Sequence, residues 1–173
     1  FAQVGLAAFR KGLIPEAHHY LMELCGYNKS KELLAQGIAF QRFGERNEDQ
    51  EKRERTRQVP YHMHVPLEHL DVAHLVSATL LEIPNMIRQQ LNPSNKRLIS
   101  RALRKQLENM ERNLFRTPPE MSREYIHHAA KALLEGDWKK CVELLGNIKF
   151  LGDVISLDML SQKVKEEALR CYC

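Results

Sequence analysis

Residues 57–84 of the chain read RQVPYHMHVPLEHLDVAHLVSATLLEIP, and this stretch decides the fold class. In its first part, apolar side chains alternate with other residues at period two from Val59 to Val65. Pro60 and Pro66 keep the residues before them out of the helical region. We therefore expect residues 59–65 to be extended and not helical.

The period changes at Pro66, which suits the first turn of a helix because its missing N–H is not needed there. Apolar groups then surround most of the helix circumference until Pro84, which we expect to end the helix. Such a helix is either buried or spans a membrane, and the three carboxylates spaced along this one favour burial. The prediction is a central buried helix whose core positions include Leu70, Leu75 and Leu81.

Two further segments, residues 1–25 and 121–145, have the pattern of helical hairpins of the tetratricopeptide type. In each, a turn glycine is followed by a bulky apolar residue two positions on and a small residue five positions on: Gly12, Ile14 and Ala17, then Gly136, Trp138 and Cys141. Asp137 is placed to cap the second helix of its pair. Repeated hairpins of this kind indicate a helical solenoid.

Apolar periodicity predicts three more helices, over residues 30–43, 95–114 and 157–172, and no strand-rich segment is long enough for a sheet. Residues 44–57 carry five acids, five bases and no apolar side chain, so either a salt-bridged single helix or a solvated linker would fit. The fold class is therefore all-α, a right-handed helical-repeat solenoid. We treat residues 1–173 as one helical-repeat region with a charged connector at 44–60.

Length, composition and cysteine spacing limit which kind of protein this can be. At 173 residues and 43% hydrophobic content, the chain makes one ordinary domain or a piece of a larger protein. It starts at Phe1 without a recognisable targeting segment, which suggests the interior of a longer protein. The four cysteines lack the close pairing of a zinc site and indicate reduced thiols in a cytosolic protein: Cys25, Cys141, Cys171 and Cys173.

Nothing in the spacing of reactive side chains supports catalysis. The eight histidines lack the zinc-protease spacing, and we expect them to be hydrogen-bonded in the core or at turns. No phosphate loop, nucleophile elbow or dinucleotide fingerprint occurs. The prediction is a protein that is not an enzyme and has no catalytic residues, metal, cofactor or small-molecule substrate.

Positive charge gathers in residues 86–116, which hold eight basic and two acidic residues, whereas the whole chain has a net charge of only +4. Five of these cations form a candidate patch, for which we expect helical spacing: Lys96, Arg97, Arg101, Arg104 and Lys105. Such a patch would meet several phosphates of duplex or structured RNA, or an acidic protein. No aromatic side chain interleaves it, so stacking on unpaired bases is not indicated. A solvated basic face is the alternative.

Residues 57–84 closely resemble the C-subunit family of eukaryotic translation initiation factor 3. Other segments resemble the same family in order: AFRKGL (8–13), KELLAQG (31–37), ERNEDQEKRER (45–55), RLIS (97–100), PPEMSRE (118–124), GDWKKC (136–141) and KEEALR (165–170). The resemblance implies a PCI-type helical scaffold in the cytoplasm, without catalytic residues and without membrane contact. Its implied partners are the factor's A subunit, further PCI and MPN subunits, and the small ribosomal subunit with its RNA and proteins.

The resemblance has limits along the chain. The winged helix that completes a PCI domain and the family's N-terminal extension have no counterpart here. The family also has a longer connection between Cys141 and Leu160, so either this chain shortened it or the sequence is interrupted near residues 150–157. Two other readings stay open: a PCI scaffold of the proteasome lid or signalosome, and a free-standing RNA-binding helical repeat.

Overall fold

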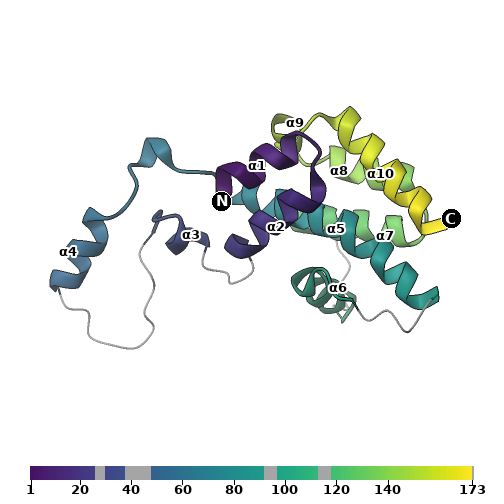
Figure 1. The fold of residues 1–173 in the computed structure, drawn as a ribbon, viewed down its shortest axis with the longest axis horizontal. Coiled ribbons are helices and arrows are strands. Elements are labelled where there is room, and N and C mark those ends of the chain that lie inside the picture. The colour runs from purple at the N-terminus through teal and green to yellow at the C-terminus, as the bar shows by residue number, and fades with distance from the viewer. Residues whose placement is uncertain (26–29, 38–47, 92–96, 113–117, 173) are drawn as a thin grey trace.

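The computed structural model describes residues 1–25, 30–37, 48–91, 97–112 and 118–172. Within these ranges every regular element is a helix, as predicted (Figure 1). The long helix α5, Leu67–Leu91, runs through the centre of the molecule. No helix in the described ranges has the length and apolar character needed to cross a membrane.

The first hairpin is formed by α1, Ala2–Arg10, and α2, Ile14–Cys25. Gly12 makes the turn with a φ of +72°, a conformation that L side chains avoid. A Cβ added at Gly5 would lie 2.7 Å from Leu21 Cδ2, so the absence of a side chain lets the two helices approach closely. Ala17 is fully buried. The predicted hairpin is therefore confirmed.

The second hairpin pairs α7, Ser122–Leu134, with α8, Trp138–Gly146. Gly136 turns the chain with a φ of +89°. Asp137 Oδ1 accepts a 3.0 Å hydrogen bond from the backbone N–H of Lys140, which confirms the predicted cap. Trp138 is half-buried and packs against the core, with the Lys165 ammonium 4.8 Å from its ring centre.

Helix α5 does not end at Pro84, and that prediction was wrong. The helix continues to Leu91, and Pro84 is buried inside it. A proline in a helix interior removes one backbone hydrogen bond and costs about 3 kcal/mol. Tertiary contacts made by α5 on both sides of Pro84 offset that cost.

The carboxylates of α5 each meet a partner on a neighbouring element. Glu68 accepts a 2.8 Å hydrogen bond from Ser122 Oγ, and Asp71 pairs with Arg123 at 2.6 Å. These contacts hold the start of α7 against α5, and the third carboxylate, Glu82, is described below. Charges on this apolar helix therefore join helices together.

Two elements differ from their predictions: one has another backbone conformation, and one helix is shorter. Residues 61–63 form one 3₁₀ turn, η1 (Tyr61–Met63), where an extended run was expected. The chain lacks a partner strand there within its described residues, and local bonds form instead: Met63 N–H to the Pro60 carbonyl at 2.9 Å and His64 N–H to the Tyr61 carbonyl at 3.1 Å. The helix expected over 30–43 is the single turn α3, Ser30–Leu33, and residues 38–43 of that prediction lie outside the described residues.

The charged segment contains a helix, α4, over Glu48–Thr56, and the open choice between helix and linker is decided for these residues. Acidic residues precede basic ones by four positions, as in Glu48 and Lys52, which stabilises an exposed helix. In Figure 1, α4 lies apart from the other helices, with α3 between it and α2. Residues 44–47 lie outside the described part of the chain.

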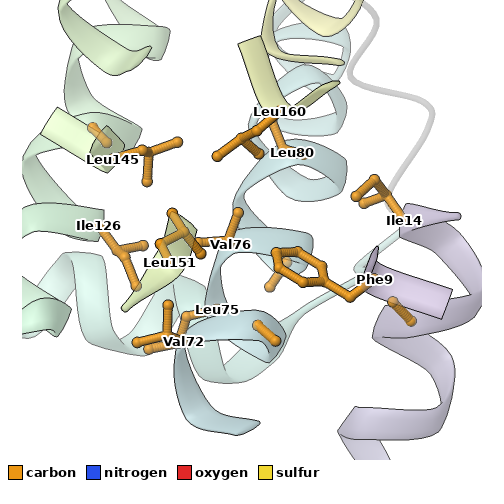
Figure 2. Packing of buried hydrophobic residues seen from close by; sticks show 14 of the residues in the cluster. Phe9, Ile14, Val72, Leu75, Val76, Leu80, Ile126, Leu145, Leu151 and Leu160 are labelled. Atoms are coloured by element: carbon orange, nitrogen blue, oxygen red, sulfur yellow. The ribbon is translucent and has the colours of Figure 1, made fainter. Parts of the chain in front are cut away.

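The core lies on both sides of α5 (Figure 2). Phe9 and Ile14 pack on one side, whereas Ile126 and Leu145 pack on the other. The predicted core residues Leu70 and Leu75 are buried, and Leu81 is half-buried against the same cluster. Two helices complete the body: the short α9, Leu151–Val154, which the pattern did not predict, and α10, Leu157–Tyr172, which it did.

Candidate partner-binding surface

The basic segment folds as α6, Arg101–Arg112, which packs against α5. Leu103 and Leu107 are buried and Met110 is half-buried, so the predicted apolar face is confirmed. The helix begins later than expected, so Arg97 precedes it and does not share its spacing. Lys96, like Leu114, lies outside the described residues.

A buried carboxylate on α5 holds the start of α6. The Glu82 side chain is 0% exposed, and its Oε2 accepts hydrogen bonds from the backbone N–H groups of Ile99 at 2.8 Å and Ser100 at 2.7 Å. Its Oε1 accepts from Asn85 Nδ2 at 3.3 Å and pairs with the Arg104 guanidinium at 2.5 Å. A charge so deeply buried is tolerated only when paired and hydrogen-bonded in this way.

Glu82 belongs to a set of three polar side chains that we call the α5 polar stripe: Glu82, Asn85 and Gln89. Their spacing of i, i+3 and i+7 places them on one face of α5. Asn85 Nδ2 donates to the Arg97 carbonyl at 2.7 Å, and Gln89 Nε2 donates to the same oxygen. The stripe thus binds both N–H and C=O groups of residues 97–100, which lead into α6.

Arg104 turns toward this stripe. Besides its pair with Glu82, its Nη2 donates a 2.7 Å hydrogen bond to Gln89 Oε1. Arg104 follows Leu103 directly, and one residue advances a helix by about 100°, so it lies at the edge of the buried face. Its guanidinium is therefore engaged within the chain, and only 32% of its side chain is exposed.

Two cations of the predicted patch remain on the outer face of α6. Arg101 and Lys105 are exposed and lie one turn apart, opposite Leu103 and Leu107. We call them the α6 basic face. Arg112 lies further along the same side, but it pairs with Glu108 at 2.5 Å. An anion approaching α6 would meet Arg101 and Lys105 first.

Between α6 and α7 lies a shallow groove of about 160 Å³. Its lining mixes apolar side chains with polar and charged ones: Met86, Leu107 and Leu134, together with Arg104, Glu108, Glu111, His127 and Lys131. Within the described residues no group of three or more metal-ligating side chains comes together. The groove has the size of one large side chain and offers no cluster of reactive groups.

Two histidines and two cysteines lie in or against the core. His18 and His74 stack with ring centres 5.4 Å apart, and neither Nε2 has a hydrogen-bond partner in the described chain, contrary to the expectation for core histidines. Burial lowers the pKa of His18 and lowers that of His74 to about 4. Burial raises the pKa of the Cys25 thiol to about 11 and that of Cys141 to about 12, so both stay protonated and unreactive.

Sequence reasoning missed the α5 polar stripe, although its signal was present. Polar residues at i, i+3 and i+7 interrupt an otherwise apolar helix, and such a set predicts a contact with backbone groups of another segment. The prediction that Pro84 ends the helix separated Glu82 from Asn85 and Gln89 and hid the pattern.

Comparison with known proteins places this sequence in a family. Residues 1–92 match the family model described as "Eukaryotic translation initiation factor 3 subunit 8 N-terminus". Curated relatives, each the C subunit of eukaryotic translation initiation factor 3, are 45% identical in Phaeosphaeria nodorum, 43% in Pyricularia oryzae and 46% in Aspergillus fumigatus, each over 98% of this chain. The chain spans about 20% of the length of these relatives. With more than half of its residues matched by the family model, the chain belongs to the C-subunit family of eukaryotic translation initiation factor 3.

Proposed function

We propose that the chain is a scaffold segment of translation initiation factor 3, without catalytic activity, that works in the cytoplasm during translation initiation. The observation that carries this proposal is its membership of the C-subunit family. The name of these relatives describes one subunit of a larger factor, and such a protein must contact the other subunits. The partners we propose are the factor's A subunit, further PCI and MPN subunits, and the small ribosomal subunit.

The architecture supports a role in holding other proteins. Helix α5 runs through the core and is packed on both sides by helical hairpins, so it joins them through one shared core. Stacked hairpins are the building units of right-handed helical solenoids, which present long surfaces to partners. On this basis we propose that the chain is the helical part of a PCI domain.

The α6 basic face is the proposed ribosome contact. Arg101 and Lys105 are exposed, share one side of α6, and are close enough to meet neighbouring phosphates of one RNA strand. Contacts to phosphates position a protein on RNA without recognising the base sequence, which fits docking on structured ribosomal RNA.

The test is affinity purification of the tagged protein at moderate salt, followed by mass spectrometry of the recovered proteins. We expect other initiation factor 3 subunits together with proteins of the small ribosomal subunit. Recovery of proteasome-lid or signalosome subunits in their place would show that the assembly was wrong. Recovery of the protein alone would refute the scaffold proposal.

A further inference from the structure

A buried carboxylate, Glu82, lies between α5 and the start of α6. Glu82 is 0% exposed, and both of its oxygens accept hydrogen bonds from residues 99–104. Well-packed apolar residues can replace a buried ion pair with no loss of stability, so the pair adds little that apolar packing would not supply. What it does specify is geometry, because the directions of four donors must all converge on one carboxylate.

We infer that Glu82 is the positioning residue of the α6 basic face: it sets the orientation of α6 on α5 and withdraws Arg104 from contact with anions. This inference rests on the proposed RNA contact of that face. With Glu82 in place, Arg101 and Lys105 are the cations of α6 that meet a phosphate backbone.

The contacts of Arg104 support this division. Its guanidinium donates through Nε to Glu82 and through Nη2 to Gln89, so two of its three nitrogens are engaged by acceptors of the α5 polar stripe. Arg101 and Lys105 lie away from that stripe, on the side of α6 opposite its buried leucines. The same segment therefore holds one arginine that bonds to α5 and two cations that face outward.

The first experiment measures binding of the chain to a short RNA duplex over a range of salt concentrations. Affinity falls as salt rises, and the steepness of log affinity against log salt counts the phosphates contacted. Each lost contact makes this slope shallower by about 1. We expect Arg101→Gln and Lys105→Gln each to make the slope shallower by about 1, and Arg104→Gln to leave it unchanged. The control is Lys149→Gln, an exposed lysine before α9 that should also leave the slope unchanged. If Arg104→Gln made the slope as shallow as Lys105→Gln does, the inference would be overturned.

The second variant, Glu82→Gln, separates positioning from simple charge. It removes one negative charge, so a charge-only account predicts tighter RNA binding. Because Glu82→Gln would also release Arg104, the variant is compared with its parent on the Arg104→Gln background. There the positioning account predicts weaker binding, by about fivefold at about 0.15 M salt, which is the factor that one phosphate contact supplies. Tighter binding would overturn the inference.

Hydrogen exchange provides a readout that does not need RNA. In Glu82→Gln we expect faster exchange at the backbone N–H groups of Ile99 and Ser100, and unchanged exchange in α7 and α8. If the parent chain shows no salt-dependent RNA binding, the proposed ribosome contact fails, and exchange alone decides the orientation of α6. Unchanged exchange at Ile99 and Ser100 would overturn the role of Glu82.

Discussion

Acid should loosen the packing of α2 on α5, because two histidines are stacked there in the core. His18 and His74 are 5% and 3% exposed, and neither Nε2 has a hydrogen-bond partner in the described chain. Burial and the neighbouring His18 lower the pKa of His74 to about 4, against the raising effect of Asp71. The same burial lowers the pKa of His18, where Glu82 acts in the opposite direction.

The direction of the pH effect on stability follows from comparing the pKa of His74 in the unfolded and the folded chain. In the unfolded chain His74 takes up its proton near its ordinary pKa of 6.5, but in the folded chain it does so only near 4. Its contribution to stability is therefore complete above pH 6.5 and is lost as the pH falls from there to 4. The loss amounts to about 2 kcal/mol at about pH 5 and about 3 kcal/mol once the pH is well below 4. His18 adds to the loss in the same direction.

The assay is denaturant unfolding of the parent chain and of His74→Leu, at about pH 7.5 and about pH 5. The variant removes the titrating group but keeps a side chain of similar volume, so at the higher pH it should lose no more than about 1.5 kcal/mol. Between the two pH values the parent should lose at least about 2 kcal/mol more than the variant. His62→Gln, at an exposed position in η1, is the matched control and should behave like the parent. Equal losses in parent and His74→Leu would refute the reasoning.

Three further test substitutions, two of them with a control substitution, probe the packing, a turn and a helix cap. Leu80→Ala, at a fully buried position in α5, should lower the free energy of unfolding by about 2–5 kcal/mol, whereas Leu91→Ala, at a position 79% exposed, should change it by less than about 0.5 kcal/mol. Gly12→Ala should lower the free energy of unfolding by about 1–2 kcal/mol, because φ is +72° and the new Cβ would lie 3.1 Å from Met159 Sδ. Its control is Gly146→Ala, where nothing lies within 4 Å of the new Cβ. That change should be neutral or stabilising by up to about 1 kcal/mol. Asp137→Ala should cost about 0.5–2 kcal/mol through the lost cap of α8, and equal thermal unfolding of that variant and the parent would contradict this.

Local chemistry made the two hairpins predictable. Gly12 and Gly136 both have positive φ, and Asp137 caps the helix that follows it, so residue type and conformation correspond directly. The central helix was predictable for a similar reason, since an apolar circumference requires burial. Such features depend on the nearest residues in the chain.

What sequence reasoning missed depends on distant residues. Pro84 predicts a helix end from local sterics, but contacts on both sides of it keep α5 helical to Leu91. Residues 61–63 alternate like a strand, yet without a partner strand in the described chain they form a 3₁₀ turn. For the candidate surface, counting charges found the cations but did not show that Arg104 turns inward to Glu82, because that pairing joins residues 22 positions apart.

The most direct measurement is co-sedimentation of the chain with purified small ribosomal subunits. The test variant is Arg101→Glu/Lys105→Glu, and the control is Lys52→Glu/Lys149→Glu, which makes the same change in net charge at two exposed lysines elsewhere. We expect the test variant to lose most of its ribosome binding and the control to bind like the parent. Equal binding by all three proteins would contradict the claim that α6 forms the ribosome contact.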